Sequence, residues 1–378
     1  MVGTGAAADL DRLTDSDWTA LNGLATQHRL RPLLYAQHGT DLRLPPDIRK
    51  DWHEAHRVSA LQAMAIRHEL TQCVALLEAA GAPPVALKGS WLAAHAYPSP
   101  ALRPMRDIDL LVPADRVLAG YAALEAAGYT EYAPAEMPLE QALRLDKHLP
   151  ALVAPRGTVV ELHHRLWEPD GRLDHASPVE SRRTEAGLVR DADGIAYLAP
   201  TETLAHLIVH AVYSHRLDCG PLLLPDIDFL LQAVPIDWPA FWSRSEREGW
   251  RSGARLVLEL VARYRPQARI DFAPDQGPPP PPELLEAAPD LLLQDLDTRR
   301  SAGLAAAALK AGPGKLLQRL RGRRGAHGEA EVTRTMEHEG GMIGWAGSRA
   351  WRSLTELARA DVRRQSRQLA ALSSWLDR

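Results

Sequence analysis

Apolar residues recur at helical spacing through the first part of the chain, residues 9–81. Residues 14–17 supply N-cap side chains for one helix, and a second helical pattern begins near Asp47 and continues to Leu77. Gly81, which two prolines soon follow, is suited to end that second helix. The pattern therefore predicts an N-terminal helical region that packs against the segment after it.

Beyond residue 81 the pattern changes to short apolar runs separated by glycine and proline. Such runs are typical of strands and short helices. They predict strands at 85–87, 107–112, 149–154 and 158–163, the last two joined as a hairpin, and helices at 91–97 and 114–128. This order predicts an α+β fold in which a small mixed β-sheet core is flanked by N-terminal and C-terminal helical regions.

Helical spacing returns at residues 200–265 and at 351–376, where arginines lie between the apolar positions. Gly277 and the five prolines after it indicate a stiff linker. We therefore predict four parts, which are a helical region at 1–81, an α/β core at 82–198, a helical domain at 199–276, and at 277–378 a Pro-rich linker, a basic flexible segment and a terminal amphipathic helix.

Composition and charge narrow the function classes. Hydrophobic residues make up 46% and charged residues 24% of the chain, which is typical of a globular protein, and the formal net charge of −4 does not indicate wholesale binding of nucleic acid. The two cysteines, Cys73 and Cys219, form no disulfide framework. The chain also lacks a signal-peptide pattern and an apolar run long enough to span a bilayer. We therefore expect a cytoplasmic protein without membrane contact.

The chemistry concentrates in the segment from Leu87 to Val112. Alternate residues of a strand share a face, so Asp107 and Asp109 would stand side by side with Ile108 facing the core. Two adjacent carboxylates repel one another unless a cation lies between them, and Mg²⁺ prefers such oxygen ligands. A Gly-Ser turn upstream of this pair points to metal-assisted phosphoryl chemistry.

Several motifs together resemble the polymerase-β-like nucleotidyltransferase superfamily, and more narrowly its bacterial branch of uncharacterised nucleotidyltransferases. The motifs are Lys88-Gly89-Ser90, Arg103, Asp107-Ile108-Asp109, Lys147-His148 and Val160-Glu161-Leu162-His163. The resemblance covers about residues 80–170 and extends more weakly to 201–226.

The resemblance implies a site of three carboxylates that holds two Mg²⁺ ions, with Mn²⁺ as the alternative metal. Asp107, Asp109 and Glu161 would be both the catalytic residues and the metal ligands. Val159, Glu161 and His163 share one face of the predicted strand, so Glu161 can lie beside the aspartates. The expected nucleotide-binding residues are Lys88, Gly89, Ser90, Arg103, Arg106, His148 and His163.

Two features depart from the family's pattern. Glu161 stands where the family usually has aspartate, and the sixteen residues 91–106 between the Gly-Ser turn and Asp107 exceed the common spacing. A second Asp-Ile-Asp, at 226–228, lies in a helical pattern where the first and third residues face apart, so we expect no catalysis there. His206 and His210 are spaced for one helix face, and we expect a structural or substrate-facing role for them rather than a zinc site.

The sequence therefore favours a Mg²⁺-dependent nucleotidyltransferase, which moves an NMP group from an NTP, ATP included, to a small molecule, peptide or protein and releases pyrophosphate. One alternative is a toxin-like enzyme that modifies tRNA, supported only by the basic run Lys315–Arg324. Another alternative is a non-catalytic nucleotide-binding or interaction module, which Glu161 and the long insert would suit. The terminal amphipathic helix is a candidate surface for self-association.

Overall fold

The computed structural model describes residues 10–134, 137–167, 187–275, 277–294 and 360–377. The chain divides into two compact units, one formed by Met1–Ser214 with Pro221–Pro279 and the other by His215–Gly220 with Pro280–Arg378. Within the described ranges no helix is both long and apolar enough to cross a membrane. The division into four functional parts stays a prediction.

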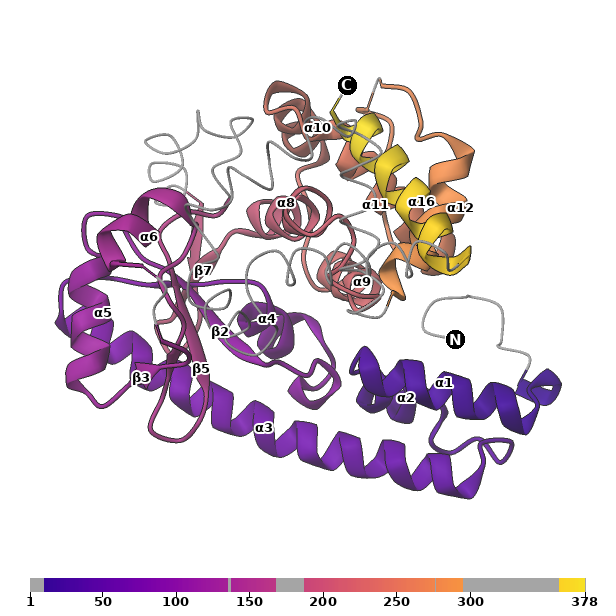
Figure 1. The fold of residues 1–378 in the computed structure, drawn as a ribbon, viewed down its shortest axis with the longest axis horizontal. Helices are drawn as coiled ribbons and strands as arrows, with labels where there is room; N and C mark the ends of the chain where they lie inside the picture. The colour runs from indigo at the N-terminus through magenta and orange to yellow at the C-terminus, as the bar shows by residue number, and fades with distance from the viewer. Residues whose placement is uncertain (1–9, 135–136, 168–186, 276, 295–359, 378) are drawn as a thin grey trace, which may run out of the picture. The chain divides into compact units, whose positions relative to one another are not determined.

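Three helices precede the sheet: α1 (Asp15–Gln27), α2 (Arg31–His38) and α3 (Pro46–Ala79). The side chain of Thr14 accepts a hydrogen bond from the backbone of Asp17 and the reciprocal bond is also present, so the predicted N-cap is confirmed. The long helix predicted near Asp47 is α3, whereas the eight-residue α2 was not predicted. Figure 1 shows that α3 runs past the sheet and carries α1 and α2 on its first half.

A seven-stranded sheet forms the centre of the first unit, in the order β3-β4-β5-β2-β1-β7-β6. Its strands are β1 (Val85–Ala86), β2 (Asp107–Leu111), β3 (Thr130–Glu131), β4 (Leu152–Val153), β5 (Val159–His163), β6 (Leu188–Arg190) and β7 (Ala196–Leu198). Strand β2 pairs parallel to β5 and β1 parallel to β7, while the other pairs are antiparallel. The predicted α+β fold with a mixed sheet is therefore confirmed.

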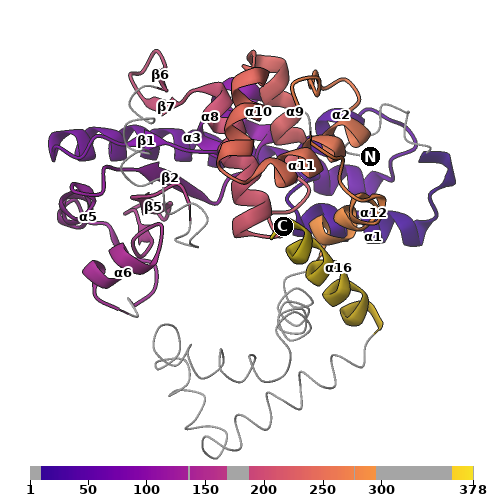
Figure 2. The same ribbon diagram turned by 90° about the horizontal axis from the view of Figure 1, so that it is seen from above.

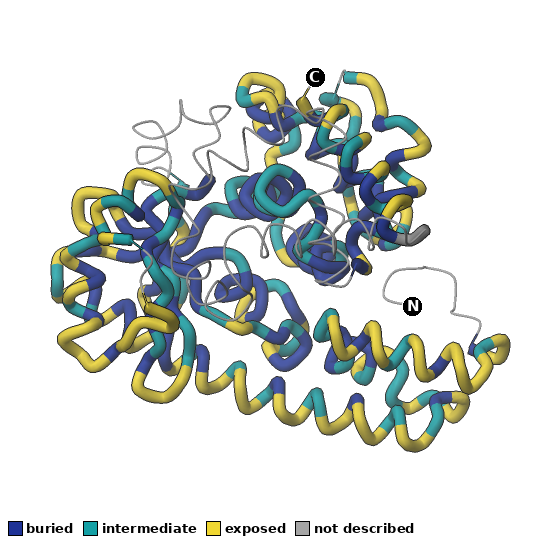
Figure 3. Tube along the Cα trace, in the orientation of Figure 1, coloured by how far each residue is buried: buried dark blue, intermediate teal, exposed yellow. Residues whose placement is uncertain are grey.

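One face of the central strands packs against helices α3 and α5 (Val117–Ala126). Ile108 and Leu110 of β2 are fully buried on that face, as the alternation predicted. Gly120 of α5 lies so close that a Cβ there would come within 2.8 Å of Leu77. The absence of a side chain at Gly120 thus brings α5 down onto α3 and fixes the apolar layer beneath the sheet (Figure 3).

The opposite face of the sheet carries the polar residues of β2 and β5. Further helices of this unit are α4 (Gly89–Trp91), α6 (Leu139–Leu145), α8 (Pro200–Val209), α9 (Leu223–Ala233), α10 (Trp238–Arg247) and α11 (Arg251–Tyr264). Short π-helical turns, Leu92–Ala96 and His210–Ser214, extend α4 and α8. The helical region predicted at 200–265 is confirmed by α8 to α11.

The second unit contains α12 (Pro282–Leu292) and α16 (Ala360–Leu376), which lie side by side (Figure 2). Val362, Leu369, Leu372 and Leu376 are buried, and Gln368 donates a hydrogen bond of 3.1 Å to Asp290 of α12. The predicted terminal amphipathic helix is confirmed from residue 360 onward. Its beginning at 351–359 and the basic run Lys315–Arg324 lie outside the described residues.

Candidate active site

The centre of the candidate site is the parallel pair of strands β2 and β5. Their register sets Asp109 directly opposite Glu161 and Asp107 opposite Val159. Asp107, Asp109, Glu161 and His163 occupy alternate positions, so their side chains leave the sheet on one face. The structure thus brings the two carboxylates of β2 together with a third from β5, about fifty residues later in the sequence.

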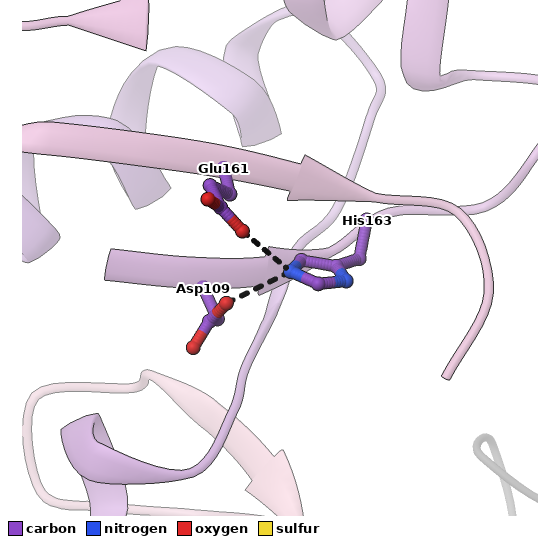
Figure 4. Close-up of side chains that lie close together, drawn as sticks. All are labelled: Asp109, Glu161 and His163. Carbon is purple, nitrogen blue, oxygen red and sulfur yellow. Dashed lines mark hydrogen bonds and ion pairs between the residues drawn. The ribbon is translucent and has the colours of Figure 1, made fainter. Parts of the chain in front are cut away.

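His163 lies between two of these carboxylates (Figure 4). Its Nε2 atom is 2.8 Å from Oδ1 of Asp109 and 3.4 Å from Oε2 of Glu161. Because ionised carboxylates only accept hydrogen bonds, Nε2 carries the hydrogen. The other ring nitrogen, Nδ1, is buried and has no partner among the described residues. A buried nitrogen without a partner is a group that a ligand or a change of ring orientation would satisfy.

Lys88 supplies a cation at the same carboxylate. Its Nζ is 3.2 Å from Oδ1 of Asp109, and the residue occupies the turn that joins β1 to α4. The turn closes with a 3.2 Å hydrogen bond from the Ser90 amide to the Leu87 carbonyl. Lys88 has φ 45° and ψ −113°, a conformation that favours glycine and costs about 1–3 kcal/mol. Strain of this kind persists where the surroundings hold it, and here it aims the ammonium at the carboxylates.

Gly89 has a steric reason to be glycine. A Cβ at this position would lie 2.7 Å from Nη1 of Arg103 and 3.0 Å from the sulfur of Met105. The guanidinium of Arg103 is held in place by Asp226, which accepts from Nε at 3.1 Å and from Nη2 at 2.8 Å. Arg103, predicted to bind nucleotide, therefore has two nitrogens committed to Asp226 while Nη1 lies toward Gly89.

The charges of the site are not balanced. Burial raises the pKa of Asp107, and repulsion from Asp109 and Glu161 raises it further. Burial has the same effect on Asp109, but the Lys88 ammonium and the hydrogen bond from His163 outweigh it and hold this pKa well below the usual range. Burial is likewise outweighed at Glu161, where His163 and His148 lower the pKa. Asp107 forms no ion pair with any described residue, and the charges of Lys88 and Arg103 offset only part of the effect that burial and the other carboxylates have on its pKa.

Further histidines surround this centre, and sequence reasoning placed only some of them here. His148, a predicted nucleotide-binding residue, lies with Nε2 3.8 Å from Oε2 of Glu161. His206 is 2% exposed and stacks edge-on against Trp167 and His210. Burial, and then Lys88 and His163, hold the pKa of His206 well below its usual value, which shows that α8 borders the site. The four-residue spacing of His206 and His210 was the only sequence signal of that position.

The second Asp-Ile-Asp lies on helix α9, as predicted. Besides Arg103, Asp226 accepts a 2.7 Å hydrogen bond from the Tyr97 hydroxyl. Asp228 is fully buried and accepts from Nε of Arg265 at 2.6 Å and from Gln267 at 2.8 Å. Each of these carboxylates therefore has its own cation, and neither lacks a counter-charge.

The donor set of the strand pair suits a divalent cation. One ligand atom each from Asp109, Glu161 and His163 lies within 4.8 Å of the others. Carboxylate oxygens suit Mg²⁺ and Mn²⁺, and an imidazole nitrogen is compatible with Mn²⁺ and later transition metals. The uncompensated Asp107 adds a third carboxylate, so a bound cation would relieve the repulsion that raises its pKa.

Comparison with known proteins gives one match. A family model described as "Uncharacterised nucleotidyltransferase" matches residues 14–266, which is more than half of the chain and includes every residue of the strand pair. No curated protein and no solved structure matches the chain.

Proposed function

The chain belongs to the uncharacterised nucleotidyltransferase family, and from that premise we propose that it transfers an NMP group from an NTP to an acceptor in the presence of Mg²⁺ or Mn²⁺. The observation that carries the proposal is the direct pairing of Asp109 with Glu161, beside the uncompensated Asp107. Two Mg²⁺ or Mn²⁺ ions held by three carboxylates would suit the transfer of an NMP group from the negatively charged NTP.

Asp107, Asp109 and Glu161 are the proposed ligands, and His163 is a fourth donor within reach. A bound divalent cation neutralises phosphate charge and lowers the pKa of an acceptor hydroxyl. Lys88 would place a positive charge beside the triphosphate, and Gly89, which is buried and has no side chain, leaves room for the guanidinium of Arg103 at the same turn. The hydroxyl of Ser90, which is 5% exposed, is a further donor at this turn.

The reaction balances as a single displacement. An acceptor oxygen bonds to the α-phosphorus while the bond from that phosphorus to the bridging oxygen of the departing pyrophosphate breaks. The acceptor proton passes to Glu161, whose pKa His163 and His148 lower, so that the ionised form, which can accept a proton, is favoured. Arg103, whose Nη1 lies toward Gly89, can meet the charge of the leaving group.

The position of a ³²P label in the NTP tests whether the NMP group is transferred. Purified protein is incubated with Mg²⁺, cell extract and each NTP carrying ³²P at either the α or the γ position. We expect the α label to appear in an acceptor, whereas the γ label should be released only as pyrophosphate. Glu161→Gln should slow the transfer at least about a hundredfold, while Glu140→Gln, on the exposed surface of α6, should not change it. Transfer of the γ label, or full activity of Glu161→Gln, would contradict the proposal.

One observation favours a second candidate, a nucleotide-binding module without turnover. A hydrogen-bond donor, His163, and a cation, Lys88, already lie against Asp109 where a metal ion would lie. Nucleotide binding that is equally tight in EDTA and in Mg²⁺, with no α-label transfer, would support this candidate over catalysis. The tRNA-modifying alternative has its only support at Lys315–Arg324, outside the described residues.

A further inference from the structure

A cavity of about 550 Å³ lies beside the first residues of β2 and β5. Its walls come from the end of α1, the start of α2, the first half of α3, the segment before β2 and the turn between β4 and β5. Four arginines line the cavity and, among the described residues, no acidic side chain does: Arg29, Arg31, Arg106 and Arg156. Its volume is in the range of small-molecule sites.

These arginines differ from others in the same unit. Arg103, Arg244, Arg251 and Arg255 each pair with a carboxylate. None of the four cavity arginines forms an ion pair with a carboxylate among the described residues, and Arg29 makes one long hydrogen bond, 3.4 Å, to the carbonyl of Pro104. Like charges gathered without a counter-charge form a binding site for an oxyanion, because guanidinium groups bind phosphate and carboxylate through paired hydrogen bonds.

Arg29 carries two further signs of this role. Burial, followed by the charges of Arg106 and Arg103, lowers the pKa of Arg29 to about 10, so the cluster disfavours its own charge. The residue also has φ 58°, at the end of α1, where the amide of Leu30 bonds to the carbonyl of Ala25. That hydrogen-bonding pattern places glycine at this position in most helices. An arginine there costs backbone energy and directs a cation into the cavity.

Much of the remaining wall is apolar. It consists mainly of α3 side chains and one proline: Pro32, Ala55, Val58, Ala65 and Ile66. Val58 is 42% exposed although it is a large aliphatic residue. A ligand that fits both walls has an oxyanion at one end and an apolar portion that covers α3.

The cavity also adjoins the carboxylates. Met105 and Arg106 line it and directly precede Asp107, while Gly157 and Thr158 line it and directly precede Val159, the register partner of Asp107. The charge of Asp107 also acts on Arg29, where it raises the pKa against the effects of burial and of the neighbouring arginines. We propose that the cavity binds the acceptor of the transfer reaction, and that the acceptor is a small molecule with a phosphate or carboxylate group and an apolar portion. The role of the ligand as acceptor rests on the proposed function, whereas the binding of an oxyanion in the cavity does not.

Binding without metal tests the site by itself. Isothermal titration in EDTA, where the metal-dependent reaction is off, compares phenyl phosphate with benzoate as probes of the two oxyanions. We expect one of them to bind to the wild-type protein. Gln62→Glu introduces a negative charge at the cavity wall and should weaken that binding at least about fivefold. The matched control is Gln72→Glu, the same change at an exposed position on the same helix outside the cavity, which should leave binding unchanged.

A second variant separates binding from folding. Arg29→Gly removes the cation and relieves the left-handed backbone, so it should raise the midpoint of thermal unfolding while weakening probe binding about tenfold. Tighter binding of phenyl phosphate than of benzoate identifies a phosphate-bearing acceptor, and the reverse order identifies a carboxylate. Failure of both probes to bind, or equal binding by Gln62→Glu and wild type, overturns the inference.

Nucleotide binding distinguishes the acceptor from the NTP. With Mg²⁺, the affinity of Gln62→Glu for ATP should stay within about twofold of the wild-type value, since the triphosphate is expected at Lys88 and Gly89. A loss for ATP as large as the loss for phenyl phosphate would show that the cavity holds the nucleotide, and would overturn the acceptor assignment. Transfer of α label without probe binding rejects the cavity alone, whereas probe binding without transfer rejects the proposed function and keeps the oxyanion site.

Discussion

The tripeptide Asp-Ile-Asp occurs twice in this chain, once on a strand and once on a helix. On β2, Asp107 and Asp109 leave the sheet on the same face and meet Glu161 of the neighbouring strand. On α9, Asp226 and Asp228 point in different directions, and each is paired with its own arginine. The same three residues thus form a crowded anionic centre in one place and two separate ion pairs in the other.

The two segments differ because a strand and a helix place alternate carboxylates differently. A period of two brings alternate carboxylates together, and a period of 3.6 separates them. The separated carboxylates on α9 are neutralised and serve packing, because Arg103 ties the segment before β2 to α9. On β2, the neighbouring carboxylates Asp109 and Glu161 raise the pKa of Asp107. This repulsion favours the binding of a cation. Function is expected where charge is gathered and left unbalanced.

Asp109→Asn should produce the largest effect on activity. It removes a proposed metal ligand at the centre of the site, and we expect NMP transfer to fall by at least about a thousandfold, or about 4 kcal/mol of activation free energy. Single-turnover rates with α-labelled NTP and Mg²⁺ measure this loss. Asp228→Asn is the matched change on α9. Its transfer rate per folded molecule should stay within about threefold of the wild-type rate. Equal losses in the two variants would remove the functional distinction between the segments.

Asp228→Asn should instead produce the larger loss of stability. Asp228 is fully buried against Arg265, and breaking a buried ion pair from one side costs about 3–5 kcal/mol because the other charge stays buried. Chemical denaturation followed by circular dichroism measures the free energy of unfolding. If Asp228→Asn were as stable as the wild-type protein, the helix pair would not be the structural ion pair that its geometry indicates.

Asp107→Asn should have a smaller effect of opposite sign on stability. The folded-state pKa of Asp107 is raised, so its ionisation opposes folding, and removing the charge should stabilise the metal-free protein by about 1 kcal/mol at pH 7. The wild-type penalty develops as pH rises from the unfolded value, about 3.9, through the raised folded value. The advantage of the variant should therefore disappear as pH falls through that window. Unfolding in EDTA at pH 7 and pH 4 measures it, and a destabilised variant at pH 7 would show that the strand charges are already balanced.

Much of the fold was predictable because its elements are long enough to show a period. The pattern of α3 extends over 34 residues, and the alternation in β2 and β5 assigns Ile108 to the core and Asp109 to the polar face. Strands β3, β6 and β7 have two or three residues, too few to alternate, and α2 has eight; β1 and β4 are equally short and were predicted only from the apolar runs at 85–87 and 149–154. Strands β3, β6 and β7 and helix α2 were missed because their tertiary pairing, rather than their own sequence, makes them regular.

The candidate site was predictable where one strand decides it and unpredictable where distant segments meet. Alternation within β5 already turned Glu161 and His163 to one face. Nothing local indicates that Asp226 holds Arg103 from 123 residues away, or that Arg29 from the N-terminal helices reaches the start of β2. The left-handed backbone at Lys88 and Arg29 was also invisible, because glycine is the residue that marks such positions in a sequence.

Lys88→Gly should have the smallest effect on stability, and yet it distinguishes the role of the β2 carboxylates from that of the α9 carboxylates. The change relieves a backbone strain of about 1–3 kcal/mol, while it removes the ion pair with Asp109, and the two contributions nearly offset each other. We expect the free energy of unfolding to change by less than about 1 kcal/mol, with NTP binding weakened about tenfold. The cations that pair with the α9 carboxylates, Arg103 and Arg265, lie in ordinary backbone, so Arg265→Gly relieves no such strain and should only destabilise. A gain of stability for Lys88→Gly with unchanged NTP binding would mean that Lys88 is strained for packing alone, whereas weakened binding at constant stability would mean that the strain serves the nucleotide.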